Sequence, residues 1–280
     1  MNPTIANHRF EFGENWQRFL AVLDEERIRQ SERSLREMLE AERLDGLRFL
    51  DVGCGSGLSS LAARRLGASV VSFDVDPQSV ACAQTLRERY LPNDPAWRIE
   101  EGSALDETYL KSLGTHDLVY SWGVLHHSGR MWQSLANVAP LVAEGGKLWI
   151  AIYNDQGRLS RLWLRVKRSY AMVPQPLRPL YVAAVMGPRL LASMAVSVVS
   201  RNPDPARGTG PLTDYKRNRG MSRWHDLVDW VGGYPFEVAK PEQIFEFFRA
   251  RGFSLVKLRT VGGALGCNEF VFERGGNFRV

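Results

Sequence analysis

The sequence predicts an α/β fold in which helices cover both faces of a mostly parallel sheet. Apolar runs near 47–52 and 69–74 are typical of buried strands, a helical pattern separates them, and a glycine-rich turn follows the first run. Repeated alternation of strands and helices builds parallel sheets. With 280 residues, 44% of them hydrophobic, the chain is long enough for one large domain with an addition.

The remaining elements follow in order. Between the first strand and residue 153 we expect strands near 47–52, 69–74, 96–101, 117–122 and 146–153, and helices at 57–66, 77–90, 106–112 and 130–142. The C-terminal part predicts helices at 223–231 and 241–251 and strands near 254–260 and 268–273. Residues 14–42 have the apolar spacing of one amphipathic helix or a broken pair, which we expect to cover the pocket as a lid.

The turn between the first two strands is the most informative feature. It carries Gly53, Gly55 and Gly57, Asp51 precedes it, and Asp74 ends the second strand. Glycines let a ligand approach the backbone, and a carboxylate at the second strand end accepts hydrogen bonds from a ribose. An acid before the turn would repel a pyrophosphate but suits the ammonium of an amino acid joined to adenosine. The turn therefore predicts S-adenosylmethionine as the ligand.

Four further segments accompany this turn in order: Asp74 to Pro77, Glu101 to Asp106, His116 to His127, and Leu141 to Tyr153. Together the five resemble the motifs of the class I S-adenosylmethionine-dependent methyltransferases, and the His126-His127 loop resembles the branch with the ubiquinone- and menaquinone-pathway enzymes. The resemblance covers 47–153 well and the C-terminal part loosely. It implies a Rossmann-like seven-stranded sheet whose final strand is antiparallel, and a methyltransferase activity.

The resemblance also implies which residues contact the cofactor. Asp74 would hold the ribose hydroxyls, the turn with Ser103 would cap the adenine, and Ser121 with Trp122 would lie beside the sulfonium. Many family members carry Asp where Ser103 stands; a serine hydroxyl can accept the same bond without charge. The expected cofactor contacts are Asp51, Gly53, Gly55, Gly57, Asp74, Val75, Ser103, Ala104, Ser121 and Trp122.

Methyl transfer often needs a base that removes the proton of the acceptor. His126 and His127 follow the fourth strand, where the family's acceptor-facing loop lies, and histidine titrates near neutral pH. Adjacent histidines cannot both point at one ligand, so we favour His126 and expect its neighbour to be structural. His225 and Glu237 are further acid/base candidates; packing or capping is the alternative for the histidine.

Aromatic and polar side chains near the predicted pocket are candidate contacts to the acceptor. They are Trp16, Tyr153, Asn154 and Tyr234. Packing of the N-terminal helix onto the sheet is the alternative role for Trp16, and a turn is the alternative for Asn154.

The cysteines and the N-terminus limit the class of protein. Cys54, Cys82 and Cys267 have no paired spacing, which indicates a reducing compartment. No Cys/His cluster has the spacing of metal ligands, so we predict no metal site. The N-terminal residues do not resemble a signal peptide, and we expect a cytoplasmic protein.

Residues 154–220 interrupt the alternation and carry the basicity of the chain. Between Asp155 and Asp204 there are eight basic residues and no acidic one; removing those eight charges from the formal +5 leaves −3 on the rest. The charge is therefore a property of this segment and is not a general signal for nucleic acid. The segment sets the expected divisions: an N-terminal lid (1–45), a cofactor-binding core (46–153), the insertion (154–220) and a completion of the sheet (221–280).

The insertion is also strongly apolar. Leu159, Leu162, Trp163, Val166 and Tyr170 predict one apolar helix face, with arginines mostly on another. Residues 180–199 are nearly all apolar, with a predicted break at 187–189. A basic amphipathic helix with a hydrophobic hairpin is typical of peripheral membrane contact over 158–200. A helical cap over the site, or a homodimer surface, is the alternative.

These observations favour an S-adenosylmethionine-dependent methyltransferase that acts on a small or lipid-linked, quinone- or phenol-like acceptor at oxygen. A glycan or secondary-metabolite hydroxyl is the nearest alternative. An RNA methyltransferase is less favoured because the arginines lie among bulky aliphatic residues and the sequence has no RNA-binding signature. The competing hypothesis from another functional class is a protein that binds the cofactor without transferase activity.

Overall fold

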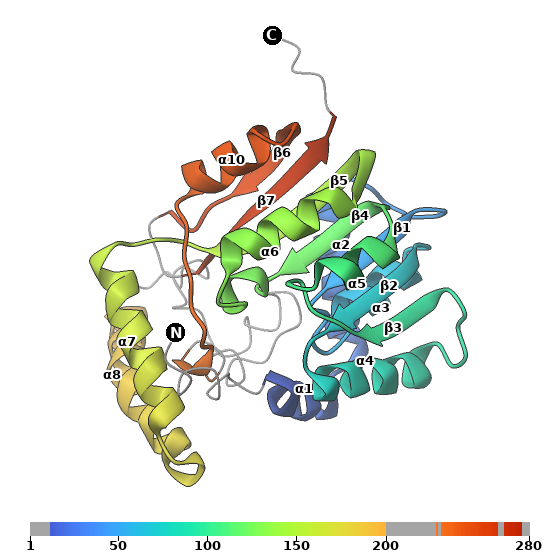
Figure 1. Cartoon of the computed structure of the whole chain (residues 1–280). Coiled ribbons are helices and arrows are strands. Elements are labelled where there is room, and N and C mark those ends of the chain that lie inside the picture. The colour runs from blue at the N-terminus through green and yellow to red at the C-terminus, as the bar shows by residue number, and fades with distance from the viewer. Residues whose placement is uncertain (1–11, 200–227, 229–230, 263–265, 276–280) are drawn as a thin grey trace.

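A seven-stranded sheet forms the centre of the computed structural model, which describes residues 12–199, 228, 231–262 and 266–275 (Figure 1). The strand order is β3-β2-β1-β4-β5-β7-β6. The strands are β1 (Arg48–Val52), β2 (Ser69–Asp74), β3 (Trp97–Glu101), β4 (His116–Trp122), β5 (Val142–Tyr153), β6 (Phe253–Arg259) and β7 (Cys267–Arg274). Strands β1 to β5 are parallel, and β7 runs antiparallel between β5 and β6. The predicted fold class is confirmed.

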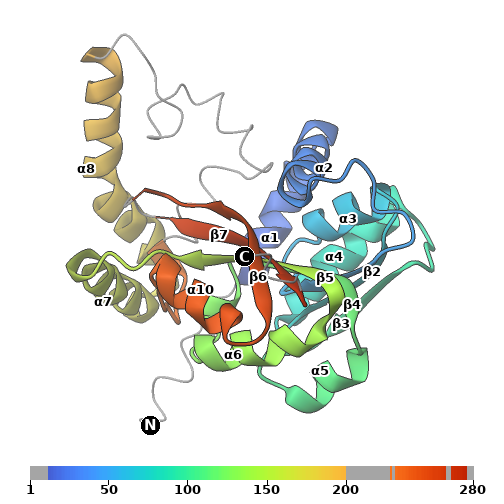
Figure 2. The ribbon, with the colours of Figure 1, turned by 90° about the horizontal axis from the view of Figure 1, so that it is seen from above.

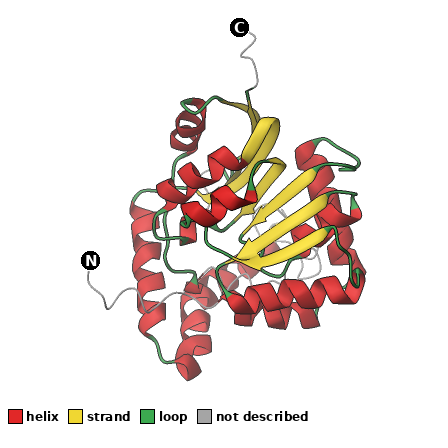
Figure 3. Cartoon of the chain, turned by 45° about the vertical axis from the view of Figure 1, so that its right-hand side comes forward, coloured by secondary structure: helices red, strands yellow, loops and turns green. Residues whose placement is uncertain are grey.

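Helices cover both faces of this sheet (Figure 2, Figure 3). They are α1 (Phe12–Ala21), α2 (Glu25–Leu39), α3 (Leu58–Arg65), α4 (Pro77–Tyr90), α5 (Glu107–Leu113), α6 (Met131–Val138), α7 (Arg158–Met172), α8 (Arg178–Val199) and α10 (Pro241–Arg249). The first four pack on one face, and α5, α6 and α10 pack on the other. Successive strand residues alternate between the two cores, as Phe49 and Leu50 do, because side chains of a strand point to opposite faces.

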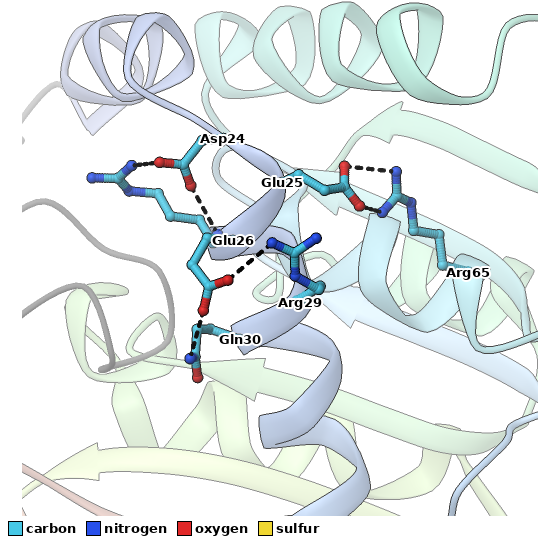
Figure 4. Close-up of polar contacts among 7 residues, drawn as sticks. Asp24, Glu25, Glu26, Arg29, Gln30 and Arg65 are labelled. Carbon is cyan, nitrogen blue, oxygen red and sulfur yellow. Dashed lines mark hydrogen bonds and ion pairs between the residues drawn. The ribbon is translucent and has the colours of Figure 1, made fainter.

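The N-terminal segment is the broken pair of helices, not one long helix. Asp24 separates α1 from α2 and accepts a hydrogen bond from the backbone N–H of Arg27, a capping contact that starts the second helix (Figure 4). Glu25 then binds the guanidinium of Arg65 on α3. The cap therefore begins the second helix, and the ion pair connects that helix to α3.

The helix predicted at 130–142 is too long. Helix α6 ends at Val138, a 3-10 turn spans Ala139–Leu141, and β5 begins at Val142. Pro140 lies in that turn, where its missing N–H cannot continue an α-helix. The strand predicted at 146–153 accordingly starts four residues earlier, and His116 pairs with Val142 before the register shifts.

In the described part of the insertion, two helices, α7 and α8, lie at one end of the molecule (Figure 1, Figure 2). Trp163 and Tyr170 of α7 pack against Val182 and Met186 of α8. The predicted break at 187–189 is wrong, since Pro188 lies inside α8. The φ of proline is itself helical, so the ring removes a hydrogen bond without having to end the helix. In the part of the chain that was described, no helix has the length and apolarity needed to cross a bilayer.

The predicted apolar face of α7 is confirmed in part: Trp163, Val166 and Tyr170 pack in a core, but Leu159 and Leu162 do not. The buried residues of the helix are Ser160, Trp163, Lys167 and Tyr170, whereas the side chains of Leu159 and Leu162 are 41% and 53% exposed. Apolar spacing alone selected a stripe that also included the two leucines. In the structure, the packing of α7 against α8 and beside the end of β5 buries a neighbouring stripe, which includes Lys167.

Candidate active site

The candidate site lies at the carboxyl ends of the parallel strands. Strands β1 and β4 are neighbours although three helices and two strands separate them in sequence, so the chain order reverses there. Ligands of open α/β sheets bind beside such a reversal. The glycine turn follows β1, Asp74 ends β2, and the two histidines follow β4, which places the predicted residues along one edge.

The glycine turn is tightly enclosed. Gly55 has a φ of +53°, and a Cβ there would lie 2.8 Å from Nε1 of Trp16 on α1. Gly53 has a φ of +77°, and a Cβ there would lie 2.3 Å from a methyl carbon of Val124. Both positions need glycine for conformation and for space. Gly57, with a φ of +79°, starts α3 beneath the same turn. Trp16, which was predicted to contact the acceptor, lies instead against the glycine turn.

Asp74 joins the glycine turn to the end of β2. Its Oδ2 accepts from the backbone N–H of Gly55 at 3.0 Å, and its Oδ1 accepts from that of Asp76 at 3.0 Å. These two contacts orient the carboxylate at the end of β2 against the glycine turn. The next residue, Val75, is 37% exposed beside it.

Asp51 lies inside the core at the end of β1, where it is 2% exposed. Its Oδ2 accepts a hydrogen bond of 2.6 Å from Ser60 on α3. The hydroxyls of Ser60 and Ser72 lie 3.0 Å apart, and Nε1 of Trp97 donates to Ser72 at 2.6 Å. Burial raises the pKa of Asp51 to about 7; the Ser60 bond opposes the rise, and the charge of Asp74 adds to it. A buried cation near this carboxylate would be stabilised strongly.

The loop after β3 is held by local and long-range contacts. The hydroxyl of Ser103 accepts from the N–H of Leu105 at 3.2 Å, and the carbonyl of Ala104 accepts from the side chain of Asn137 at 3.1 Å. The N–H of Gly102 donates to the carbonyl of Asp74 at 2.9 Å. The loop therefore lies next to the predicted ribose contact, as its assignment to the adenine requires.

At the end of β4, the two residues expected beside the sulfonium, Ser121 and Trp122, are more enclosed than that role suggests. Ser121 has no exposed surface, and its hydroxyl donates to the carbonyl of Val52 at 3.0 Å. It therefore connects β4 to β1, and a cofactor contact would have to come from its backbone. Trp122 is half-buried and packs beside the core under α2 and α3.

The two histidines after β4 have different environments. Nδ1 of His127 lies 2.6 Å from the carbonyl of Pro235; because a carbonyl only accepts, Nδ1 carries a proton and donates it. His126 has no exposed surface, and neither ring nitrogen makes a hydrogen bond of normal geometry within the described residues. Burial lowers the pKa of His126 well below its ordinary value; charge on His127 and Lys167 lowers it further, and the Ala151 carbonyl opposes this.

Tyr153, at the end of β5, completes this cluster. Its ring centroid lies 4.0 Å from that of His126 and 5.4 Å from that of His127. On its other side the ring of Phe236 lies 5.2 Å away. Three segments distant in sequence therefore meet at the carboxyl ends of β4 and β5.

Other predicted residues have structural contacts. The carboxylate of Glu237 accepts from the N–H of Met131 at 2.8 Å, at the start of α6, and burial raises its pKa. Oδ1 of Asn154 accepts from the side chain of Asn268 at 3.1 Å. The half-buried Tyr234 has the guanidinium of Arg168 6.0 Å from its ring centroid. His225 lies outside the described residues.

Sequence reasoning missed two features of this site. The first is Lys167, which is fully buried beside Tyr153; its position four residues after Trp163 was the available signal. The second is the buried chain from Asp51 to Trp97, for which the sequence offered only scattered polar residues in apolar runs. Among the described residues, no group of three or more His, Cys, Asp or Glu side chains could hold a metal ion.

Comparisons with known proteins agree with this geometry. Residues 50–148 match a family model described as a methyltransferase domain. A ubiquinone biosynthesis O-methyltransferase of Rhizobium rhizogenes is 30% identical over 119 residues, 42% of this chain and 46% of that protein. A tRNA U34 carboxymethyltransferase of Ectopseudomonas mendocina is 37% identical over 107 residues, 38% of this chain and 32% of that protein. The chain thus spans less than half the length of these curated relatives.

Solved structures show how far the fold is shared. The magnesium protoporphyrin IX methyltransferase of Synechocystis PCC 6803, solved with bound SAH, superposes with a TM-score of 0.55. The alignment covers 93% of each chain at 14% sequence identity. At that identity the likeness concerns the fold, and it extends beyond the matched domain to nearly the whole chain.

Proposed function

On the premise that residues 50–148 form a class I S-adenosylmethionine-dependent methyltransferase domain, we propose that this protein transfers a methyl group from S-adenosylmethionine to an oxygen of a small or lipid-linked acceptor. One observation carries the proposal: two carboxylates, Asp51 and Asp74, flank a positive-φ glycine turn at the ends of adjacent parallel strands. One is buried and the other is partly exposed, which suits an ammonium and a ribose respectively.

The residues present fit the cofactor. Asp51 would pair with its ammonium, because a carboxylate whose pKa burial has raised gains most from a neighbouring cation. Asp74, whose carboxylate the N–H groups of Gly55 and Asp76 orient, would accept from the ribose hydroxyls, and Ser103 would meet the adenine. The bound cofactor supplies a methyl group on a positively charged sulfur.

The chain itself must orient the acceptor and remove its proton. We assign the removal of the acceptor proton to His127, not to the sequence-based choice His126, because the Pro235 carbonyl orients the His127 ring beside Tyr153 and His126 is fully buried. His126, buried and neutral, would instead support the ring of Tyr153. Tyr153 would form the wall against which the acceptor is positioned.

The insertion favours an acceptor at a lipid surface. Exposed apolar side chains concentrate on it; they are Leu159, Leu162, Met172, Leu177 and Leu180. Arg158, Arg161 and Arg165 are exposed on the same helix as the first two leucines, so the surface combines apolar and positive groups. Anionic lipid headgroups complement that combination. This supports a quinone- or phenol-like, lipid-linked acceptor over a glycan or another soluble hydroxyl; a homodimer surface would be the competing use of the same face.

An RNA acceptor is the second candidate, and the relative named a tRNA U34 carboxymethyltransferase is what favours it. The exposed arginines could contact phosphates, although the intervening leucines would gain nothing from RNA. A protein that binds the cofactor without transferring methyl groups is the remaining alternative.

Incubation of the pure protein and radiolabelled S-adenosylmethionine with a fractionated lysate tests these proposals together. Label extracted into organic solvent supports a lipid-linked acceptor. Label in the aqueous small-molecule or glycan pool contradicts the lipid assignment, and label in RNA favours the second candidate. Cofactor binding without label in any fraction would contradict methyl transfer itself.

A further inference from the structure

Glu269 of β7 is a buried carboxylate with one oxygen that makes no hydrogen bond to any described residue. The residue is 7% exposed and lies outside the matched methyltransferase domain. Its Oε1 is 3.8 Å from the guanidinium of Arg259, whose side chain is 53% exposed, while its Oε2 is the oxygen without a donor. A buried carboxylate oxygen without a donor costs free energy, because the water that bonded to it has been lost. The position of Glu269 therefore needs an explanation beyond this ion pair.

Glu269 differs in this respect from the other carboxylates near the candidate site. Asp51 accepts a hydrogen bond from a serine hydroxyl, and Asp74 and Glu237 accept from backbone N–H groups. Each of those groups is oriented by a donor of the protein. Oε2 of Glu269 instead suits a donor that comes from a bound ligand.

The pairing of β7 with β5 places Glu269 next to the proposed acceptor site. Glu269 pairs with Ala151 of β5, and the residue two positions earlier, Cys267, pairs with Tyr153. Paired residues, and residues two positions apart on one strand, project from the same face of a sheet. Glu269 and Tyr153 are therefore diagonal neighbours, about 7 Å apart at Cβ, a separation that a long side chain can bridge. The ring of Tyr153 also lies 5.4 Å from that of His127, so the carboxylate and the proposed base are neighbours of the same ring.

The residue next to Glu269 fixes this end of β7. Asn268 is 1% exposed; its Oδ1 accepts from the N–H of Val261 at 3.1 Å, and its Nδ2 donates to Oδ1 of Asn154 at 3.1 Å. The N–H of Asn154 in turn donates to the carbonyl of Gly266 at 3.0 Å. These bonds connect β7 to the end of β5 and to the chain after β6. A carboxylate on an element held in this way can select a ligand by the position of its donor as well as by charge.

We infer that Glu269 is a specificity-determining residue whose Oε2 accepts a hydrogen bond from a second polar group of the acceptor. The inference rests on the proposed function and adds to it a chemical class: besides the hydroxyl that receives the methyl group, the acceptor carries a further hydroxyl or an amine. An ether at that place would leave Oε2 buried without a donor, and a carboxylate would oppose it with a like charge. Sites with a buried polar group strongly reject analogues that lack its hydrogen-bond partner.

Binding of three para-substituted phenols to the wild-type protein saturated with S-adenosylhomocysteine tests this inference. The probes are 4-hydroxybenzyl alcohol, 4-hydroxybenzylamine and 4-(methoxymethyl)phenol, and only the last has no donor in its side chain. We expect at least one of the first two to bind about tenfold or more tightly than the methyl ether, as measured by calorimetry. Tighter binding of the alcohol or of the amine distinguishes a hydroxyl from an ammonium as the group that Glu269 contacts.

Three variants assign the preference to Glu269. Glu269→Leu should abolish it, because both acceptor oxygens are removed while most of the volume remains. Glu269→Gln, which keeps an acceptor oxygen but no charge, should weaken binding of the amine more than that of the alcohol. Glu273→Leu is the matched control and should leave the preference unchanged, since Glu273 is four positions further along β7 and pairs with Lys147 at the other end of β5.

Equal binding of the three probes by the wild-type complex, or tighter binding of the ether, would overturn the inference. A donor preference that survives in a folded Glu269→Leu, or that Glu273→Leu loses equally, would do the same. Melting temperatures report on folding, and neither the wild-type comparison nor Glu269→Gln depends on the stability of Glu269→Leu. A wild-type protein that does not bind S-adenosylhomocysteine would contradict the proposed function itself, an outcome distinguishable because that affinity is measured first.

Discussion

Ser60 donates a hydrogen bond of 2.6 Å to Asp51, and both residues are almost completely buried. The serine is on α3, directly after the glycine turn, and the aspartate is the penultimate residue of β1, the strand before the turn. The bond therefore connects the strand before the glycine turn to the helix after it. Ser72 and Trp97 extend the contact to β2 and β3, so the carboxylate that we assign to the cofactor ammonium is positioned by three neighbouring elements.

The affinity for S-adenosylhomocysteine should depend on the ionisation of Asp51. Its pKa of about 7 means that the carboxylate is half ionised near neutral pH in the free protein. Affinity should rise with pH towards that value and level off above it, and about one unit below it binding should be about tenfold weaker. Calorimetric titrations over a pH series measure this.

Ser60→Ala should move this profile to higher pH, because the lost hydrogen bond opposed the rise in pKa. Ser59→Ala, which removes the neighbouring hydroxyl that contacts Tyr120, is the matched control. An affinity independent of pH in the wild type would show that Asp51 does not meet the ammonium.

Asp51→Asn should stabilise the protein in the absence of cofactor. The carboxyl ionises near 3.8 when unfolded and near 7 when folded, so between these values the folded state retains a proton that the unfolded state has lost. Stability therefore falls as pH rises from about 4 to about 7 and is constant above. At slightly alkaline pH the variant should gain roughly 4 kcal/mol in urea unfolding. A loss of stability there would mean that the carboxylate is solvated or paired.

Asp74→Ala should weaken S-adenosylhomocysteine binding by about a hundredfold, the effect of losing two hydrogen bonds to a charged acceptor. Glu101→Ala is the matched control, since Glu101 is exposed at the end of the adjacent strand and pairs in register with Asp74. Calorimetry measures both affinities. Equal affinities for the two variants would remove Asp74 from the proposed pocket.

His127→Asn should lower turnover about a hundredfold or more, with little change in S-adenosylhomocysteine affinity, because a general base acts only in the transfer step. His126→Leu should retain most of the activity, since that ring is buried and neutral. Label transfer to the acceptor fraction measures turnover for both. The reverse result, an active His127→Asn and an inactive His126→Leu, would restore His126 as the base.

Replacement of Leu159 and Leu162 by serine should reduce binding to vesicles of phosphatidylglycerol by about tenfold, since exposed apolar area and positive charge together determine such binding. Val256 and Leu258, exposed to a similar degree on β6, are the control pair for the same double substitution. Co-sedimentation with phosphatidylglycerol and phosphatidylcholine vesicles provides the readout. A wild-type protein that remains in the supernatant with both lipids contradicts membrane contact.

Local patterns determined most of the core of the fold. Strands β1 and β2, the helix between them and the glycine turn were all predicted from apolar runs and glycine spacing, because these elements form between residues close in sequence. The antiparallel β7 followed from the resemblance to a family. The same patterns predicted too long a helix at α6 and a break inside α8. Pro140 lies in the turn that follows the end of α6, whereas Pro188 lies inside α8 without ending it.

The sequence by itself determined the sheet, the order of its elements and the candidate residues along one edge. Only the tertiary structure decided the hydrogen bond of His127 Nδ1 to a carbonyl 108 positions later, and the burial of Lys167 beside Tyr153. Helical spacing fixes which side chains share a stripe, but the neighbouring element decides which stripe is buried. Chemistry that depends on burial and on long-range contacts therefore becomes visible only when the packing is known.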